Sequence, residues 1–185
     1  MNKMNKQFNK KELDLLKLIV NTNINKIVHD EFIYTNTSFG HVNIISNNNI
    51  YELKCSIDNF YYFGDPEDVA VLSFNEVNEK DVKSELSDHK QTETKINDTL
   101  LNVDVINESQ YVKIGNKEYL YEYTKGIILY FNNIEYGFKM SSWFSEIIEI
   151  HKGYNLIDKF KDHKRFKESF KLADAVEVTS NIVRL

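Results

Sequence analysis

Apolar and polar residues alternate along much of this chain, which is the pattern of strands with one buried face. The clearest run places apolar residues at every second position: Ile134, Tyr136, Phe138 and Met140. Successive side chains of a strand point to opposite faces, so these four are predicted to face a core while the residues between them face water. Residues 50–57 alternate in the same way, and further strands are predicted over 24–35, 41–46, 69–74 and 176–185.

The stretch of about 110–140 is predicted to form a four-stranded antiparallel meander. Its turns are predicted at dipeptides containing Gly or Asn, which tolerate positive φ: Gly115-Asn116, Lys125-Gly126 and Asn132-Asn133. Residues 127–131 are apolar at every position, as in an inner strand covered on both faces. Three tyrosines share one face of the preceding run: Tyr119, Tyr121 and Tyr123. We expect them to form a covered aromatic ladder rather than an exposed binding surface.

Three segments have helical rather than alternating periodicity. In residues 9–21, Asn9 and Glu12 have the spacing of a capping box and precede an apolar stripe. Residues 143–151 and 155–171 are predicted to be C-terminal helices, each with a capping residue at its start. The lysine-rich residues before the first helix are interpreted as a solvated tail. The predicted fold class is therefore α+β, with a mainly antiparallel sheet packed by an N-terminal helix and two C-terminal helices.

The chain of 185 residues is predicted to form one domain, 1–185, because neither half would bury a sufficient core alone. Residues 75–109 differ from the rest in having few apolar residues. From 65 to 108 there are 12 acidic residues and 4 lysines, a net charge of −8. The helical spacing of pairs such as Ile96 and Leu100 predicts one or two weak surface helices. We therefore expect an acidic, weakly structured excursion at about 75–109.

The composition argues against several classes of function. The single cysteine, Cys55, excludes an internal disulfide and any multi-cysteine metal site, and its apolar strand predicts a buried, inert thiol. No run approaches the ~20 apolar residues of a membrane span and no signal peptide is evident, so we expect a cytoplasmic protein without membrane contact. The net charge of −5, with 2 arginines among 23 basic residues, argues against nucleic acid as a partner. No metal site or cofactor is predicted, because no two of the five histidines have the i, i+4 spacing of a helical metal site.

One strand carries a pattern that is typical of an enzyme site. Glu52 and Lys54 lie two residues apart on the polar face of residues 50–57, and this Glu-x-Lys resembles the second half of the PD-(D/E)xK nuclease pattern. The resemblance implies a Mg²⁺ or Mn²⁺ ion held by Glu52 and an upstream aspartate, with Lys54 polarising the attacking water. Asn43 stands where the pattern has aspartate, and Asp30 is the nearest upstream substitute. The alternative interpretation of Glu52 and Lys54 is an ordinary solvated ion pair.

Two functions follow from these patterns, and the first is preferred. It is a small cytoplasmic, non-catalytic protein-binding module, such as an inhibitor or immunity-type protein of a bacterium or phage. Its predicted binding surface is the acidic segment, with these residues: Asp65, Glu67, Asp68, Glu76, Glu79, Asp81 and Glu85. The partner would be another protein, and the sequence leaves the oligomeric state open. The alternative is a nuclease of the PD-(D/E)xK kind, active or degenerate, that uses Glu52, Lys54 and Asp30 with Mg²⁺ or Mn²⁺ as cofactor.

Overall fold

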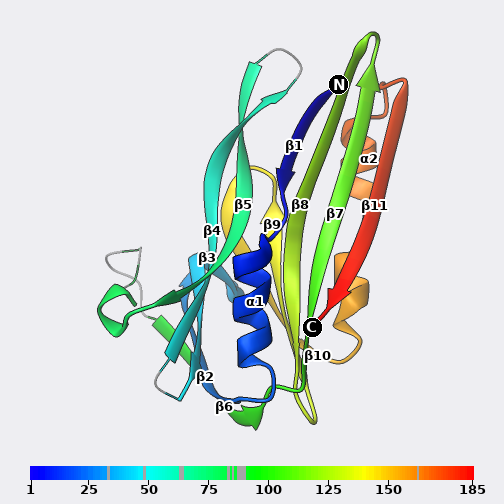
Figure 1. The fold of residues 1–185 in the computed structure, drawn as a ribbon. Helices are drawn as coiled ribbons and strands as arrows, with labels where there is room; N and C mark the ends of the chain where they lie inside the picture. Colours follow the sequence, from blue (N-terminus) through cyan, green and yellow to red (C-terminus); the bar gives the residue numbers. More distant parts are fainter. Residues whose placement is uncertain are drawn as a thin grey trace.

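Antiparallel pairing accounts for most of the fold in the computed structural model, which describes all residues except 33, 48, 63, 64, 83, 85, 87–90 and 162 (Figure 1). At residues 35, 62, 81 and 165 only the backbone is described. The described part contains eleven strands of one sheet together with a few short helices. The predicted α+β class holds only loosely, because the sheet is much larger than the predicted meander and there is less helix than predicted.

In chain order, the strands are β1 (Asn2–Lys6), β2 (Asn23–Phe32), β3 (Tyr34–Ser46), β4 (Asn49–Tyr62), β5 (Asp65–Val77), β6 (Gln91–Thr99), β7 (Asn102–Ile114), β8 (Lys117–Tyr130), β9 (Glu135–Ser142), β10 (Ser145–Gly153) and β11 (Ala175–Arg184). The helices are α1 (Lys10–Ile19) and α2 (Lys164–Ser169), and two short 3₁₀ helices are η1 (Glu79–Asp81) and η2 (Leu156–Phe160).

The sheet branches at two of its strands. Its main path runs β11-β7-β8-β9-β10-β3-β2-β6, and the neighbours on this path are antiparallel. On the edge of β8 away from β7, β1 pairs in parallel with residues 119–123, and β9 pairs with 126–130. On the edge of β3 away from β2, β10 pairs with 37–39 and β4 with 41–46, and β5 then pairs with β4. Figure 1 shows the β4–β5 and β7–β8 ribbons on either side of α1.

Helix α1 begins at the predicted capping box. The Asn9 side chain accepts the N–H of Glu12, and the Glu12 carboxylate accepts the N–H of Asn9. Leu16 and Ile19 are completely buried in the main core. The second carboxylate oxygen of Glu12 accepts the backbone N–H of Phe74 in β5 at 3.1 Å. Glu12, which completes the capping box, therefore also links the helix to the sheet.

The tyrosines of β8 lie in the interior, so the prediction of a covered ladder is confirmed. Tyr119, Tyr121 and Tyr123 are at most 3% exposed. The rings of Tyr121 and Tyr123 stack with centroids 4.7 Å apart, and Trp143 meets Tyr121 edge-on at 5.2 Å. The apolar run 127–131 is buried except for partial exposure at its fourth residue, as expected of an inner strand.

Two of the three predicted turns are present and the third prediction is wrong. Gly115, with φ of +58°, joins β7 to β8, and Asn132-Asn133 separates β8 from β9. Lys125-Gly126 instead lies inside β8, at a register shift in its pairing with β7. Glycine is required there for close packing, because a Cβ at 126 would collide with the backbone carbonyl of Phe138 in β9. The four-stranded meander is therefore β7–β10, and it extends to residue 153.

Neither predicted C-terminal helix has the expected form. The prediction for 143–151 is wrong, because β10 covers most of it and pairs with β9 on one edge and β3 on the other. The β-branched Ile148 is fully buried in that pairing, where the sheet supplies the backbone partners that a helix would have supplied. The segment 155–171 is divided into η2 and α2. Its first part is fixed by Phe160, which is completely buried against the outer face of β8.

Two segments predicted to lack strands contain them. Residues 2–6 form β1 rather than a solvated tail, and Lys3 pairs with Glu122 of β8 at 2.8 Å. Within the acidic excursion, Ile96 belongs to β6 and Leu100 follows it directly, so the predicted helix there is wrong. Antiparallel pairing of β6 with β2 overrides the local helical spacing. Residues 83, 85 and 87–90 of the excursion lie outside the described part.

Candidate binding site

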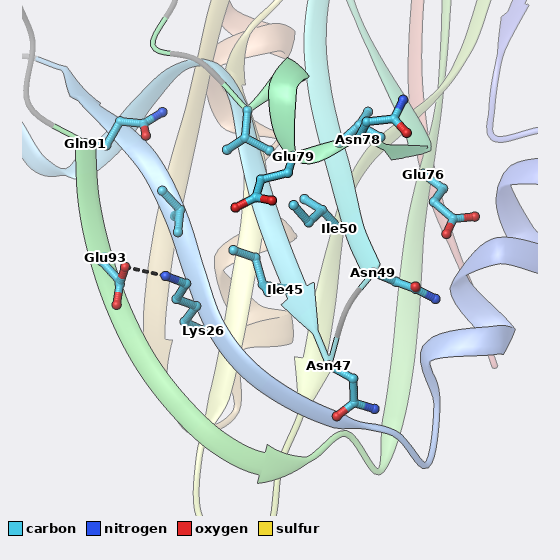
Figure 2. Close-up of a pocket in the computed structure, with 13 residues that line it drawn as sticks. Lys26, Ile45, Asn47, Asn49, Ile50, Glu76, Asn78, Glu79, Gln91 and Glu93 are labelled. Atoms are coloured by element: carbon cyan, nitrogen blue, oxygen red, sulfur yellow. Dashed lines mark hydrogen bonds and ion pairs between the residues drawn. The ribbon is translucent and has the colours of Figure 1, made fainter.

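A cavity of about 1080 Å³ lies over β2–β6, on the face opposite the main core (Figure 2). Strand alternation gives it an apolar floor. Ile45 and Ile50 are direct cross-strand partners, and Val77 is the partner of Ile50 on β5, so these three side chains share one face. Their neighbour Ile44 points to the other face and is completely buried in the core. The floor exists because apolar residues occupy positions 45, 50 and 77 of a face that also carries polar residues such as Asn43 and Glu52.

The walls of the cavity carry more negative than positive charge. Three carboxylates line it, Glu76, Glu79 and Glu93, and one ammonium, Lys26. Lys26 Nζ lies 2.6 Å from Glu93 Oε2, the ion pair drawn in Figure 2. Neither Glu76 nor Glu79 has an ion-pair partner among the described residues. Glu79 carries its charge over the floor, whereas Glu76, which neighbours Val77 on β5, directs its carboxylate away from the floor at the rim of the cavity (Figure 2).

Amide side chains complete the walls. They come from the β3–β4 turn, the end of β5 and the start of β6: Asn47, Asn49, Asn78 and Gln91. Each amide offers both donors and an acceptor. An apolar floor under carboxylates and amides suits a ligand with an apolar stem and a cationic head, such as a lysine or arginine side chain.

The structure divides the predicted acidic binding surface into two parts. Glu76 and Glu79 line the cavity, as described above. Asp65, Glu67 and Asp68 are exposed at the start of β5, where it pairs with the end of β4 in a projecting ribbon (Figure 1). The two parts therefore lie at opposite ends of β5. Of the remaining two predicted residues, Asp81 is the last residue of η1, described in its backbone alone, and Glu85 lies outside the described residues.

The residues of the nuclease-like pattern lie beside the cavity floor. Glu52 is the direct cross-strand partner of Asn43, and Lys54 is that of His41, so all four share the cavity face. Both β4 residues are partly buried, while Asn43 is completely buried. Asp30 is also completely buried and accepts a hydrogen bond from the Ser84 hydroxyl at 2.9 Å. Asn43, which occupies the position where the nuclease pattern has aspartate, is thus the direct cross-strand neighbour of Glu52.

These residues do not fit a Mg²⁺ or Mn²⁺ site. Among the described residues, no three His, Cys, Asp or Glu side chains are grouped closely enough to hold a metal ion. Asn43 places a neutral amide where the nuclease pattern requires a carboxylate, which is a weak ligand for a hard cation. The alternative nuclease function thus gains no support from the geometry of Glu52, Lys54 and Asp30.

Burial disfavours the charged forms of two titratable groups on the core face of β2 and β4. Burial lowers the pKa of His29 below its ordinary value of 6.5, against the opposing effects of Asp30 and Glu31. Burial raises the pKa of Cys55 to about 12, with a smaller contribution from Glu146. The prediction of an inert, buried thiol at Cys55 is confirmed.

Sequence reasoning missed most of the cavity, because its residues come from four separate segments. Lys26 is on β2, Asn47 and Asn49 flank the β3–β4 turn, and Gln91 and Glu93 are on β6. One local signal was present in the sequence. Ile45 and Ile50 are each adjacent in sequence to an apolar residue of the core face, which breaks the alternation and marks a second covered surface.

Comparison with known proteins adds no assignment. Neither a family model, nor a curated protein, nor a solved structure matches the chain. Within the described part of the chain, no helix has the length and apolar character that crossing a bilayer requires.

Proposed function

We propose that the chain is a protein-binding module that accepts a basic segment of another protein in the cavity over β2–β6. The observation that supports this is the carboxylate of Glu79 above a floor of Ile45, Ile50 and Val77, with the carboxylate of Glu76 at the rim of the cavity (Figure 2). The aliphatic stem of a lysine or arginine would lie on the floor while its charged head reaches the carboxylates. Charge-assisted hydrogen bonds of this kind are stronger than those between neutral groups.

The projecting β4–β5 ribbon supports the same partner chemistry. Its exposed acids, Asp65, Glu67 and Asp68, carry charge of the same sign as the cavity. Exposed charges outside a binding site contribute to the rate of encounter with a partner more than to the final affinity. Within this proposal the partner presents a basic surface. If that surface is the partner's active surface, binding would block it, and the chain would act as an inhibitor or immunity-type protein.

The test uses a fluorescent peptide of alternating arginine and glycine as a defined basic probe, with fluorescence polarisation at low ionic strength. The variant Glu76→Gln/Glu79→Gln removes the two cavity carboxylates, and we expect it to weaken binding by about tenfold or more. The matched control is Glu118→Gln/Glu177→Gln, which changes the net charge equally outside the cavity lining, at a partly buried position on β8 and an exposed position on β11. The control should bind nearly as well as the unmodified protein.

Two results would contradict the proposal. Equal weakening by both double variants would show that the peptide responds to overall charge. Binding that is unchanged in Glu76→Gln/Glu79→Gln would exclude the cavity as the basic-segment site. A separate experiment places a photoreactive residue either at position 47, in the cavity lining, or at position 182 on β11. Crosslinking of a host protein from position 47 but not from 182 would show that this partner contacts the cavity.

A further inference from the structure

At the other end of the sheet, three side chains are arranged as a nucleophile, a base and an acid. Ser180 of β11 and Glu108 of β7 are direct cross-strand partners, so both side chains lie on one face. His163, which immediately precedes α2, lies between them. Its Nε2 is 3.3 Å from Ser180 Oγ, and its Nδ1 is 3.0 Å from Glu108 Oε2. Figure 1 shows α2 behind β7 and β11.

The two contacts of His163 differ in quality. The Ser180 hydroxyl is placed to donate to Nε2, which leaves the Nδ1 proton to face Glu108. The Nδ1–H bond is not aligned with the carboxylate oxygen of Glu108. The two atoms are therefore within ion-pair distance but do not form a hydrogen bond of good geometry. Contacts of this kind in substrate-free enzymes are often misaligned and become straight when substrate binds.

Glu108 is fixed more firmly than a surface carboxylate would be. Its side chain is 2% exposed, and it accepts hydrogen bonds from Tyr123 Oη at 2.7 Å and Gln110 Nε2 at 2.5 Å. Lys125 Nζ lies 2.5 Å from the same oxygen that faces His163. The carboxylate is therefore held in one orientation, and Lys125 competes with the imidazole for it.

Ser180 is exposed, so a substrate can reach its hydroxyl. Among the described residues β11 pairs only with β7, which leaves its other edge unpaired. Alternate N–H groups of an edge strand point away from the sheet, so an outward N–H belongs either to Ser180 or to both of its neighbours, Thr179 and Asn181. Within the inference below, such an edge donor would serve the oxygen of a carbonyl that approaches Ser180.

We infer that Ser180, His163 and Glu108 form an ester-cleaving site that is separate from the cavity over β2–β6. Ser180 Oγ attacks the acyl carbon, and its proton passes to His163 Nε2. The bond to the leaving oxygen then breaks and that oxygen receives the proton, which leaves an acyl-serine. Water attacks the acyl carbon, gives its proton to His163, and Ser180 recovers its proton as the acid leaves. Glu108 acts as the positioning residue that orients the imidazole.

The chemical class of substrate follows from the surroundings. Ser180 lies exposed on an edge strand, so the proposed substrate is a small acyl ester and selectivity between acyl groups should be low. The site depends neither on the carboxylates of the cavity nor on a basic partner. Failure of one proposal therefore leaves the other unaffected.

The experiment is covalent labelling of the full chain with a fluorophosphonate, which forms an Oγ–phosphorus bond and releases fluoride. Intact mass and peptide mapping should show one label, on Ser180. We expect Ser180→Ala to lose the label and His163→Gln to slow labelling and p-nitrophenyl acetate hydrolysis by about a hundredfold or more. Ser109→Ala, which removes a hydroxyl on the neighbouring strand β7, is the matched control and should label at the rate of the unmodified chain.

A further variant separates positioning from a structural role for Glu108. Lys125→Met removes the cation that shares Glu108 Oε2, so the imidazole gains the full carboxylate and labelling should become several times faster. Slower labelling in a folded Lys125→Met would exclude Glu108 as the residue that orients His163. A label on another serine, equal labelling of Ser180→Ala, or no labelling of the unmodified chain would overturn the inference.

Discussion

At the scale of single residues, Gly126 decides how β8 and β9 meet. A Cβ at this position would collide with the carbonyl oxygen of Phe138 and lie 2.7 Å from the Phe160 ring. We expect Gly126→Ala to lower the free energy of unfolding by about 3 kcal/mol or more, because backbone cannot move aside as a side chain can. Urea denaturation followed by circular dichroism measures this change.

Gly137 provides the matched control for that substitution. A Cβ there would meet only the side chains of Phe160 and Leu156, at 3.3 and 3.4 Å. Gly137→Ala should therefore change the free energy of unfolding by no more than about 1 kcal/mol. Equal losses in the two variants would mean that the close approach at Gly126 does not constrain the sheet.

Glu149 on β10 makes stability depend on pH. Burial alone would raise the pKa of this carboxyl, but hydrogen bonds from His151, Lys139 and Ser141 outweigh it and lower the pKa from 4.5 to about 2. A carboxyl whose pKa is lower in the folded than in the unfolded state stabilises the fold. This contribution is fully present at pH values above the unfolded-state pKa, and it is lost as the pH falls through the folded-state pKa. Glu149 should contribute about 2–3 kcal/mol at pH 7, less than half of that near pH 3 and almost nothing below pH 2.

Urea denaturation of Glu149→Gln from pH 7 to pH 2 tests this dependence. The difference in unfolding free energy between the unmodified chain and the variant should shrink as the pH falls. Asp14→Asn, at an exposed helix position with its carboxylate 3.7 Å from Lys17 Nζ, is the control and should show no comparable trend. A difference that stays constant with pH would contradict the assignment.

At the scale of elements, α1 depends on Glu12 more than on its cap residue. Asn9→Ala removes one capping side chain and should cost about 1 kcal/mol. Glu12→Ala removes the reciprocal cap and also leaves the buried N–H of Phe74 without its acceptor, so we expect a loss of about 3 kcal/mol. Thermal and urea denaturation should rank the two variants in this order, with Asp14→Ala within about 0.5 kcal/mol of the unmodified chain. A cost at Glu12 no larger than that at Asn9 would show that the link to β5 is unimportant.

Elements defined by neighbouring residues could be predicted from the sequence. The Asn9–Glu12 capping box, the alternating run within β9 and the closing strand β11 all appear where they were predicted. In each case the deciding information is contained in fewer than about ten consecutive residues. Strand β10 shows the limit of such information. Its sequence allows either helix or strand, and the pairing edges of β9 and β3, distant in sequence, decide between them.

At the scale of the whole molecule, the two candidate sites show why function was harder to predict than fold. The acids Glu76 and Glu79 were predicted to bind, but their cavity also needs residues of β2, β3 and β6. The grouping of Glu108, His163 and Ser180 likewise joins three segments that no local spacing connects. Side chains at such sites are brought together by strand order, which the alternation of a single strand does not specify.

The parallel pairing of β1 with β8 has a consequence for synthesis of the chain. Asn2 pairs with Tyr119, so the two partners are 117 positions apart in the sequence. At the usual ~5–20 residues per second, β8 is made roughly 6–25 s after β1. Throughout that interval β1 is a nascent segment without the strand that will receive it, and unpaired strand edges of this kind promote aggregation. Lys3 and Lys6, which later pair with acids in the folded sheet, keep this segment in water while the ribosome completes its partner.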